Sequence, residues 1–240
     1  MSDWIAKRFW TEVNVIELDR GFAVQLDKRL VMTPAKATLL VPTRAMAEAV
    51  ASEWCVVIDK INPHLMPVTR SANAAIDKVA LQFNEVAVML AAYGGSDLLC
   101  YRAENPESLV QRQIDGWDPL LDWAHEMFGV RLVSTTGIMP INQSRHDLAV
   151  LSGPLFKATH FELAALHDLI ALSGSLIIAL GVTKGLLSPA DAWAVSRIDE
   201  TWQAEQWGSD DDADQVVEIK RTAFMHAANF HLMASNNARG

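Results

Sequence analysis

The 240-residue chain lacks the sequence patterns of the common nucleotide and nucleophile sites. It has no glycine-rich phosphate loop ending in Gly-Lys-Ser/Thr, no Gly-x-Gly-x-x-Gly dinucleotide motif and no Gly-x-Ser-x-Gly nucleophile turn. Its two cysteines, Cys55 and Cys100, form no Cys-x-x-Cys pair, which argues against a thiolate metal site and against a disulfide scaffold. We therefore expect no cofactor, no metal and no catalytic residues.

Positive charge and long apolar runs are also scarce. The chain has 20 Lys and Arg against 29 Asp and Glu, a balance opposite to that of most proteins that contact nucleic-acid phosphates. The most apolar stretch, residues 169–183, is shorter than the roughly 20 residues that cross a bilayer, so it predicts a buried helix. The first residues show neither a signal-peptide core nor transit-peptide character. We expect a cytoplasmic protein that neither inserts into membranes nor binds nucleic acid.

Apolar and polar residues alternate through the first forty positions, which is typical of strands with one buried face. The pattern predicts a hairpin of residues 13–18 and 22–26, further strands at 30–33 and 39–41, and then a helix that Thr43 caps. From about Thr69 onward the apolar residues recur every three or four positions, as in helices.

Capping signals divide this second part into several helices. Helix starts are predicted at Asn105-Pro106, Asp118-Pro119, Thr159 with Glu162, and Ser188-Pro189, and ends at Gly129 and Gly208. The sequence thus predicts an α+β protein, with strands first and helices after. Residues 1–68 would form a small antiparallel β domain with one helix, and residues 69–240 an all-helical domain similar to an orthogonal bundle.

One carboxylate, Glu205, stands out in the helix expected after Ser188. On a continuous helix it would share a face with Leu187, Ala190, Ala194, Ile198 and Trp202. Burial of an unpaired carboxylate costs several kcal/mol, so Glu205 needs a partner. The partner could be internal, such as Arg112 or Arg221, or it could be a basic residue of a client protein.

Ordered blocks from about Lys7 to Phe230 resemble the chaperone family that assists assembly of the α subunit of the F-type ATP synthase. They are Arg8-Phe9-Trp10, Leu26 to Ala35, Val41 to Thr43, Glu53-Trp54, Met66 to Thr69, Asp97 with Tyr101-Arg102, Gln113 with Trp117 to Trp123, Ser173 to Ile178, and Gln203 to Gly208. The resemblance implies a small N-terminal domain that contains strands and a helical C-terminal domain.

The resemblance also implies a function without catalysis. Such a chaperone binds the unassembled α subunit as a monomer and shields the surface that later pairs with the β subunit. The family's functionally sensitive glutamate matches Glu205, and we expect the client-binding residues to be Glu205, Trp202, Trp207, Gln203 and Ile198.

Two other functions remain open at this stage. The first is an enzyme whose acid and base groups are scattered along the chain, with Glu205, Asp97, Tyr101 and His167 as candidates. The second is an adaptor for a different client. A deep pocket that gathers the four side chains would favour the enzyme, and a shallow apolar surface around Glu205 would favour the chaperone.

Overall fold

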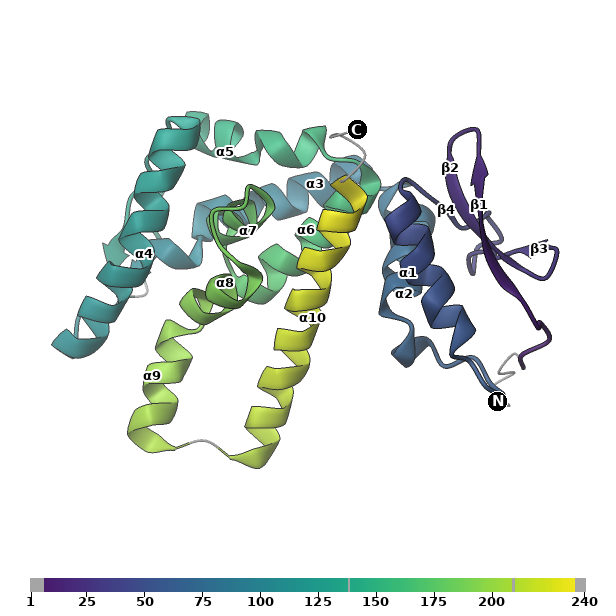
Figure 1. The fold of residues 1–240 in the computed structure, drawn as a ribbon. Coiled ribbons are helices and arrows are strands. Elements are labelled where there is room, and N and C mark those ends of the chain that lie inside the picture. Colours follow the sequence, from purple (N-terminus) through teal and green to yellow (C-terminus); the bar gives the residue numbers. More distant parts are fainter. Residues whose placement is uncertain (1–6, 138, 209, 236–240) are drawn as a thin grey trace. The chain divides into compact units, whose positions relative to one another are not determined.

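A computed structural model describes residues 7–137, 139–208 and 210–235 and shows an α+β fold with strands first and helices after, as predicted (Figure 1). The chain divides into two compact units. The first contains the residues up to Phe83 together with residues 159–165 and those from Asn229 onward. The second contains residues 84–158 and 166–228.

The first unit is built on a small antiparallel sheet. Strand β1 (Val13–Leu18) pairs with β2 (Gly21–Leu26) in the predicted hairpin, and β2 also pairs with β3 (Arg29–Leu30) and β4 (Leu40–Val41). The third and fourth strands are shorter than predicted. Pro34 has no N–H to donate, which helps to limit the pairing after β3.

Helix α1 (Arg44–Cys55) begins after Thr43, as predicted. The Thr43 hydroxyl accepts a hydrogen bond from the Met46 N–H at 3.2 Å and donates one to the Met233 carbonyl at 2.8 Å. The core of this unit joins the sheet and α1 to aromatic residues from much later in the sequence. Its larger members are Trp10, Leu26, Leu39, Met46, Val50, Met66, Phe161, Phe230 and Met233.

The helical run predicted from Thr69 is interrupted. It contains helix α2 (Pro67–Ala74), a π-helical turn at Ala75–Val79 and helix α3 (Phe83–Ala91). The domain boundary predicted between residues 68 and 69 falls inside α2. Residues 1–68 as a separate domain therefore stay a prediction, next to the two units defined by backbone contacts.

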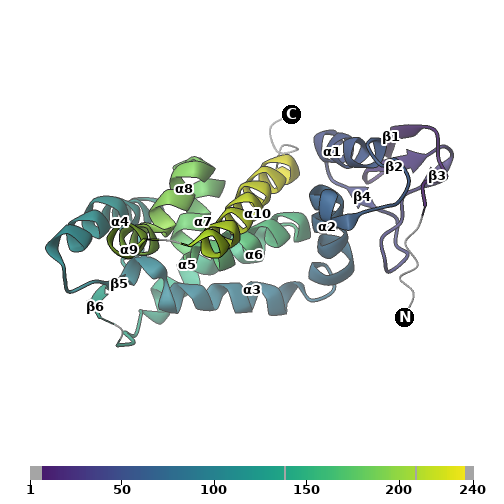
Figure 2. The same cartoon turned by 90° about the horizontal axis from the view of Figure 1, so that it is seen from below.

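Helices α4 to α10 follow in the order of the sequence (Figures 1 and 2). They are α4 (Glu107–Phe128), α5 (Arg145–Lys157), α6 (His160–Ser173), α7 (Leu176–Thr183), α8 (Pro189–Ser196), α9 (Ile198–Trp207) and α10 (Asp211–Ser235). The second unit also contains one short parallel pair, β5 (Tyr101–Arg102) with β6 (Thr135–Thr136).

Helix α4 continues through Pro119, so the helix start predicted at Asp118-Pro119 is wrong. The buried positions Leu109, Gln113, Trp117, Leu120 and Ala124 are spaced by three or four residues across the proline. Continuous burial of this face outweighs the backbone hydrogen bond that Pro119 cannot donate. The end of the helix at Gly129 is as predicted, since this residue has φ 70° and donates its N–H to the His125 carbonyl at 2.8 Å.

The apolar stretch 169–183 is mostly buried, but it forms two helices instead of one. Gly174 breaks the run with φ 72°, and the Ser175 hydroxyl caps α7 by accepting a hydrogen bond from the Ile178 N–H at 3.0 Å. The predicted capping box is confirmed at the start of α6. There the Thr159 N–H donates to Glu162 at 2.7 Å and the Glu162 N–H donates to the Thr159 hydroxyl at 3.2 Å.

Candidate functional site

The segment that contains Glu205 forms two helices, α8 and α9, and not the single helix predicted from Ser188 to Gly208. Ser188 does start α8, but Arg197 leaves the helical conformation with φ −116° and ψ 17°. The face deduced for a continuous helix therefore does not exist, and no residue of α9 is buried. The expectation that Glu205 lies among buried apolar side chains is wrong.

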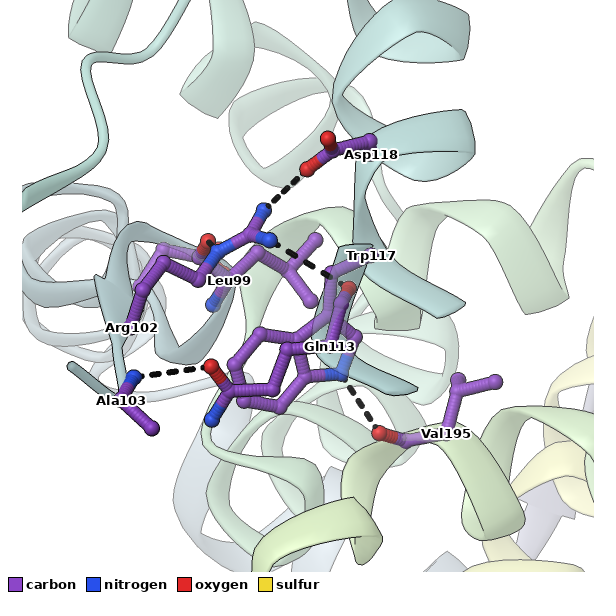
Figure 3. A network of polar contacts seen from close by, with 8 residues as sticks. Leu99, Arg102, Ala103, Gln113, Trp117, Asp118 and Val195 are labelled. Carbon is purple, nitrogen blue, oxygen red and sulfur yellow. Dashed lines mark hydrogen bonds and ion pairs between the residues drawn. The ribbon is translucent and has the colours of Figure 1, made fainter. Parts of the chain in front are cut away.

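Helix α9 is attached to α4 through Gln113, which is 1% exposed. The Gln113 side-chain N–H donates to the carboxylate of Asp199 on α9 at 2.6 Å. Its side-chain carbonyl accepts from the Ala103 N–H at 2.8 Å, as Figure 3 shows. One buried amide thus joins the loop before α4 to the first turn of α9.

Trp117, one turn further along α4, is fully buried. Its indole N–H donates to the Val195 carbonyl on α8 at 2.8 Å (Figure 3). The Arg102 guanidinium lies 5.2 Å from the centre of the Trp117 ring, pairs with Asp118 at 2.7 Å and donates to the Leu99 carbonyl at 2.7 Å. These contacts anchor the end of α8 to α4.

Gly116 allows α4 and α9 to approach each other closely. A Cβ atom at this position would lie 2.6 Å from Cδ1 of Ile198, so the side chain of Ile198 occupies the space that glycine leaves. Ile198 is therefore partly used in packing inside the chain. Sequence reasoning missed Gly116, although a glycine in the middle of a helix, where it is unfavourable, is a signal for close packing.

Glu205 forms an ion pair with Arg112 of α4 at 2.7 Å, one of the two internal partners considered from the sequence. The hydrogen bond with Arg112 lowers the pKa of Glu205 below its usual value and raises that of Arg112. The two side chains are 45% and 46% exposed, so both charges remain accessible to solvent. Arg221, the other internal candidate, pairs with Glu218 at 3.2 Å.

The remaining predicted residues lie along the same short helix. Trp202 is partly buried, and its ring contacts that of Trp207 edge to face with 5.8 Å between the centres. Trp207 is 75% exposed, and Gln203 is exposed as well. The end of α9 thus presents a large aromatic side chain two residues after an accessible ion pair.

The four residues considered for an enzyme lie in different segments of the chain, and the contacts of Asp97, His167 and Glu205 are with other residues. Asp97 is fully buried, and its carboxylate accepts from the Leu99 N–H at 3.1 Å and from the Ile177 N–H at 3.2 Å. Burial raises the pKa of Asp97 to about 6. His167 contacts Asp168 at 2.8 Å, and this hydrogen bond raises the pKa of the imidazole. Tyr101 lies in β5, and Glu205 pairs with Arg112 as described above.

Within the described residues, no group of three or more His, Cys, Asp or Glu side chains could hold a metal ion. In the same part of the chain, no helix has both the length and the apolar character needed to cross a membrane.

Sequence reasoning also missed Val216, Val217 and Ile219, three exposed residues of α10. Their signal is the presence of large apolar side chains next to a run of aspartates.

Comparison with known proteins finds several relatives. The family described as ATP12 chaperone protein matches residues 7–125. The mitochondrial protein atp12 of Schizosaccharomyces pombe is 24% identical over 222 residues, which cover 88% of this chain and 76% of that protein.

Solved structures are similar over almost the whole chain. The crystal structure of Atp12 from Paracoccus denitrificans has a TM-score of 0.93 and 45% identity, and the match covers 95% of this chain and 98% of that one. A point mutant of Atp12p from the same organism has a TM-score of 0.94 with 97% and 100% covered. A protein of Agrobacterium tumefaciens has a TM-score of 0.89 and 41% identity, with 96% and 86% covered. The chain therefore belongs to the ATP12 chaperone family, and it is a chaperone and not an enzyme.

Proposed function

We propose that this chain binds the unassembled α subunit of the F-type ATP synthase and shields the surface that later pairs with the β subunit. An uncovered apolar subunit interface is an aggregation hazard until its partner arrives. Binding of the free subunit alone, followed by displacement by β, would suppress aggregation by mass action without nucleotide hydrolysis. The resemblance of the sequence blocks to this family supports the choice of client.

We place the client contact at the exposed end of α9, with Glu205, Trp202, Trp207, Gln203 and Ile198 as its residues. The observation that carries this proposal is the 75% exposure of Trp207 beside the accessible Glu205–Arg112 pair. Tryptophan and paired charges are frequent among the residues that dominate binding energy. Ile198 would contribute indirectly, because its side chain packs against Gly116 and so holds α9 against α4.

The charge of Glu205 can be tested separately from its internal ion pair. We expect Glu205→Lys to weaken binding of purified α subunit, because it reverses a charge that the client would face. The double variant Glu205→Lys with Arg112→Glu restores an internal pair in the opposite orientation. If Glu205 faces the client, the double variant stays defective, whereas full recovery would show that only the internal pair matters.

The control variant for this test is Glu126→Lys, which reverses an exposed carboxylate elsewhere on α4. It should bind α like the unsubstituted chain. Capture of α by the tagged chain, and its release by β, tests the client itself. A chain that captures another protein and ignores purified α would be an adaptor for a different client.

We further propose that the chain acts as a monomer in the cytoplasm. The two Paracoccus structures are of a bacterial protein, whereas the fission yeast relative is named as mitochondrial. Light scattering of the purified chain tests the first statement, and cell fractionation tests the second.

A further inference from the structure

Helix α10 has an apolar face that the chain covers at one end and leaves uncovered at the other. Ala227 and Ala228 are buried. Val216 and Val217 lie eleven residues before them, which is close to three full turns, so they point from the same face of the helix. Yet Val216 is 51% exposed and Val217 is 40% exposed, and Ile219 nearby is 64% exposed.

The uncovered face belongs to a segment that contacts little else in the chain. All residues from Asp210 to Thr222 are exposed, and so are those from Gln203 to Gly208. Figure 1 shows the end of α9 and the start of α10 extending beyond α7 and α8. A helix surrounded by water is usually polar on every side, so a Val-Val-x-Ile group on such a helix indicates a surface that a partner covers.

Charge is distributed as unevenly as exposure. Eight of the 29 acidic residues and none of the 20 basic ones lie between Ile198 and Ile219. The other 218 residues have 21 acidic and 20 basic side chains, a formal charge of −1, whereas the whole chain has −9. Three of the eight, Glu200, Glu205 and Glu218, pair with arginines, and the carboxylates of the first turn of α10, Asp211, Asp212 and Asp214, directly precede the uncovered face. This charge would repel anionic lipids and nucleic acids and would attract a cationic partner.

We infer that Val216, Val217 and Ile219, here called the α10 face, dock a positively charged amphipathic segment of the client. Its apolar side chains would cover the α10 face, while its lysine or arginine residues would lie near the surrounding carboxylates. The inference rests on the proposed function, because it takes the client to be the unassembled α subunit. It adds a second contact surface, separate from the end of α9, and specifies the chemistry of the partner.

The apolar and charged parts can be tested with two variants. The triple change Val216→Ser, Val217→Ser and Ile219→Ser removes the apolar side chains but keeps the charges. We expect it to weaken binding of purified α subunit about tenfold or more. The triple change Asp211→Asn, Asp212→Asn and Glu218→Gln removes three charges but keeps the α10 face.

The charge variant should show its defect only where electrostatic attraction is long-ranged. In about 0.1 M NaCl, with a Debye length of roughly 10 Å, we expect about tenfold weaker binding. In about 1 M NaCl, with a Debye length of roughly 3 Å, the variant and the unsubstituted chain should bind alike. If the charge variant bound α as tightly as the unsubstituted chain at both NaCl concentrations, the charges would not be required and the proposal of a cationic partner would be overturned.

Matched controls remove similar groups from other surfaces. Val88→Ser with Met89→Ser changes exposed apolar residues of α3, and Asp122→Asn with Glu126→Gln neutralises exposed carboxylates of α4. Both should bind α normally. Circular dichroism and urea unfolding should show that all four variants keep the fold, since the substituted side chains are exposed.

The possible outcomes separate this inference from the proposed function. If the unsubstituted chain does not bind α, the proposed function and the inference about the α10 face are both wrong. If it binds α and the serine variant binds equally well, the α10 face is not a docking surface, although the proposed function stands. Self-association of the unsubstituted chain that the serine variant abolishes would assign the α10 face to a second copy and overturn the inference.

Discussion

The contact between α4 and the α8–α9 segment differs in every respect from the exposed end of α9 and the start of α10. The side chains of Trp117 and Gln113 are buried and hydrogen-bonded to named partners. Around Trp207 and the α10 face, large apolar side chains are exposed next to a run of carboxylates. The contacts of the first region stabilise the fold of the chain itself, whereas the exposed apolar side chains of the second region are explained by binding to a partner.

The two tryptophans give the largest expected effect and the most direct test of this difference. Trp117→Ala should lower the free energy of unfolding by about 3–5 kcal/mol, because it leaves a cavity and removes the hydrogen bond to the Val195 carbonyl. Trp207→Ala should change it by less than about 0.5 kcal/mol, because the side chain is mostly exposed. Urea unfolding of both variants measures the contrast, and similar losses would contradict it.

The buried carboxyl of Asp97 should make the stability of the fold depend on pH. Asp97 has a pKa of about 6 in the folded protein, above its model-peptide value of 3.8, so the folded state binds a proton that the unfolded state does not between these values. The stability that Asp97 contributes is therefore fully present below pH 3.8 and is lost as the pH rises through about 6.

In the Asp97→Asn variant this contribution disappears. Relative to that variant, the unsubstituted chain should gain on the order of 3 kcal/mol in the free energy of unfolding between pH 7 and pH 4. Urea unfolding at several pH values measures the difference. If the unsubstituted chain and Asp97→Asn showed the same pH dependence, the assignment to the buried Asp97 carboxyl would be contradicted.

Two glutamines that lie two residues apart on α4, and so on different faces of the helix, provide a finer test. Gln113→Leu leaves the Ala103 N–H and the Asp199 carboxylate without their hydrogen bonds, so it should cost about 1–3 kcal/mol. Gln111 is exposed and donates to Asp115, and Gln111→Leu should cost less than about 0.5 kcal/mol. Thermal unfolding compares the two, and a neutral Gln113→Leu would show that the buried amide does not fix α9.

The Glu205–Arg112 pair lies between the two regions, and we expect its effect on stability to be the smallest. The pKa of Glu205 is lowered in the folded protein, so its contribution is present above the unfolded pKa and is lost as the pH falls through the folded pKa. Glu205→Gln should therefore lower the thermal midpoint slightly at pH 7 and not at all at strongly acidic pH. A large loss at pH 7 would mean that the pair is a structural element.

Local signals were sufficient to predict much of the fold. Alternation gave the β1–β2 hairpin, and side-chain caps gave the starts at Thr43, Thr159 and Ser188. The failures arose where packing between distant segments outweighs the local signal. Pro119 continues α4 because its neighbours on both sides bury the same face. No proline or glycine stands next to Arg197, so the sequence has no local signal for the helix break there.

The candidate site was predicted only in part for the same reason. The ion pair of Glu205 with Arg112 joins residues on two helices, and the sequence could name both partners but could not choose between Arg112 and Arg221. The error in the exposure of Glu205 followed from extending one helix through Arg197. The α10 face was overlooked because a run of aspartates precedes it, although Asp211 and Asp212 begin the helix that carries it.

The carboxylates around the α10 face have a consequence for the free protein. An uncovered apolar surface invites a second copy of the same chain to bind there, and two such surfaces are mutually complementary by hydrophobicity. Here each copy would bring the same excess of negative charge, so like-charge repulsion opposes the homotypic contact. Such a chaperone can stay monomeric while it has no client bound, because the same negative charge opposes self-association and favours binding of a positively charged client.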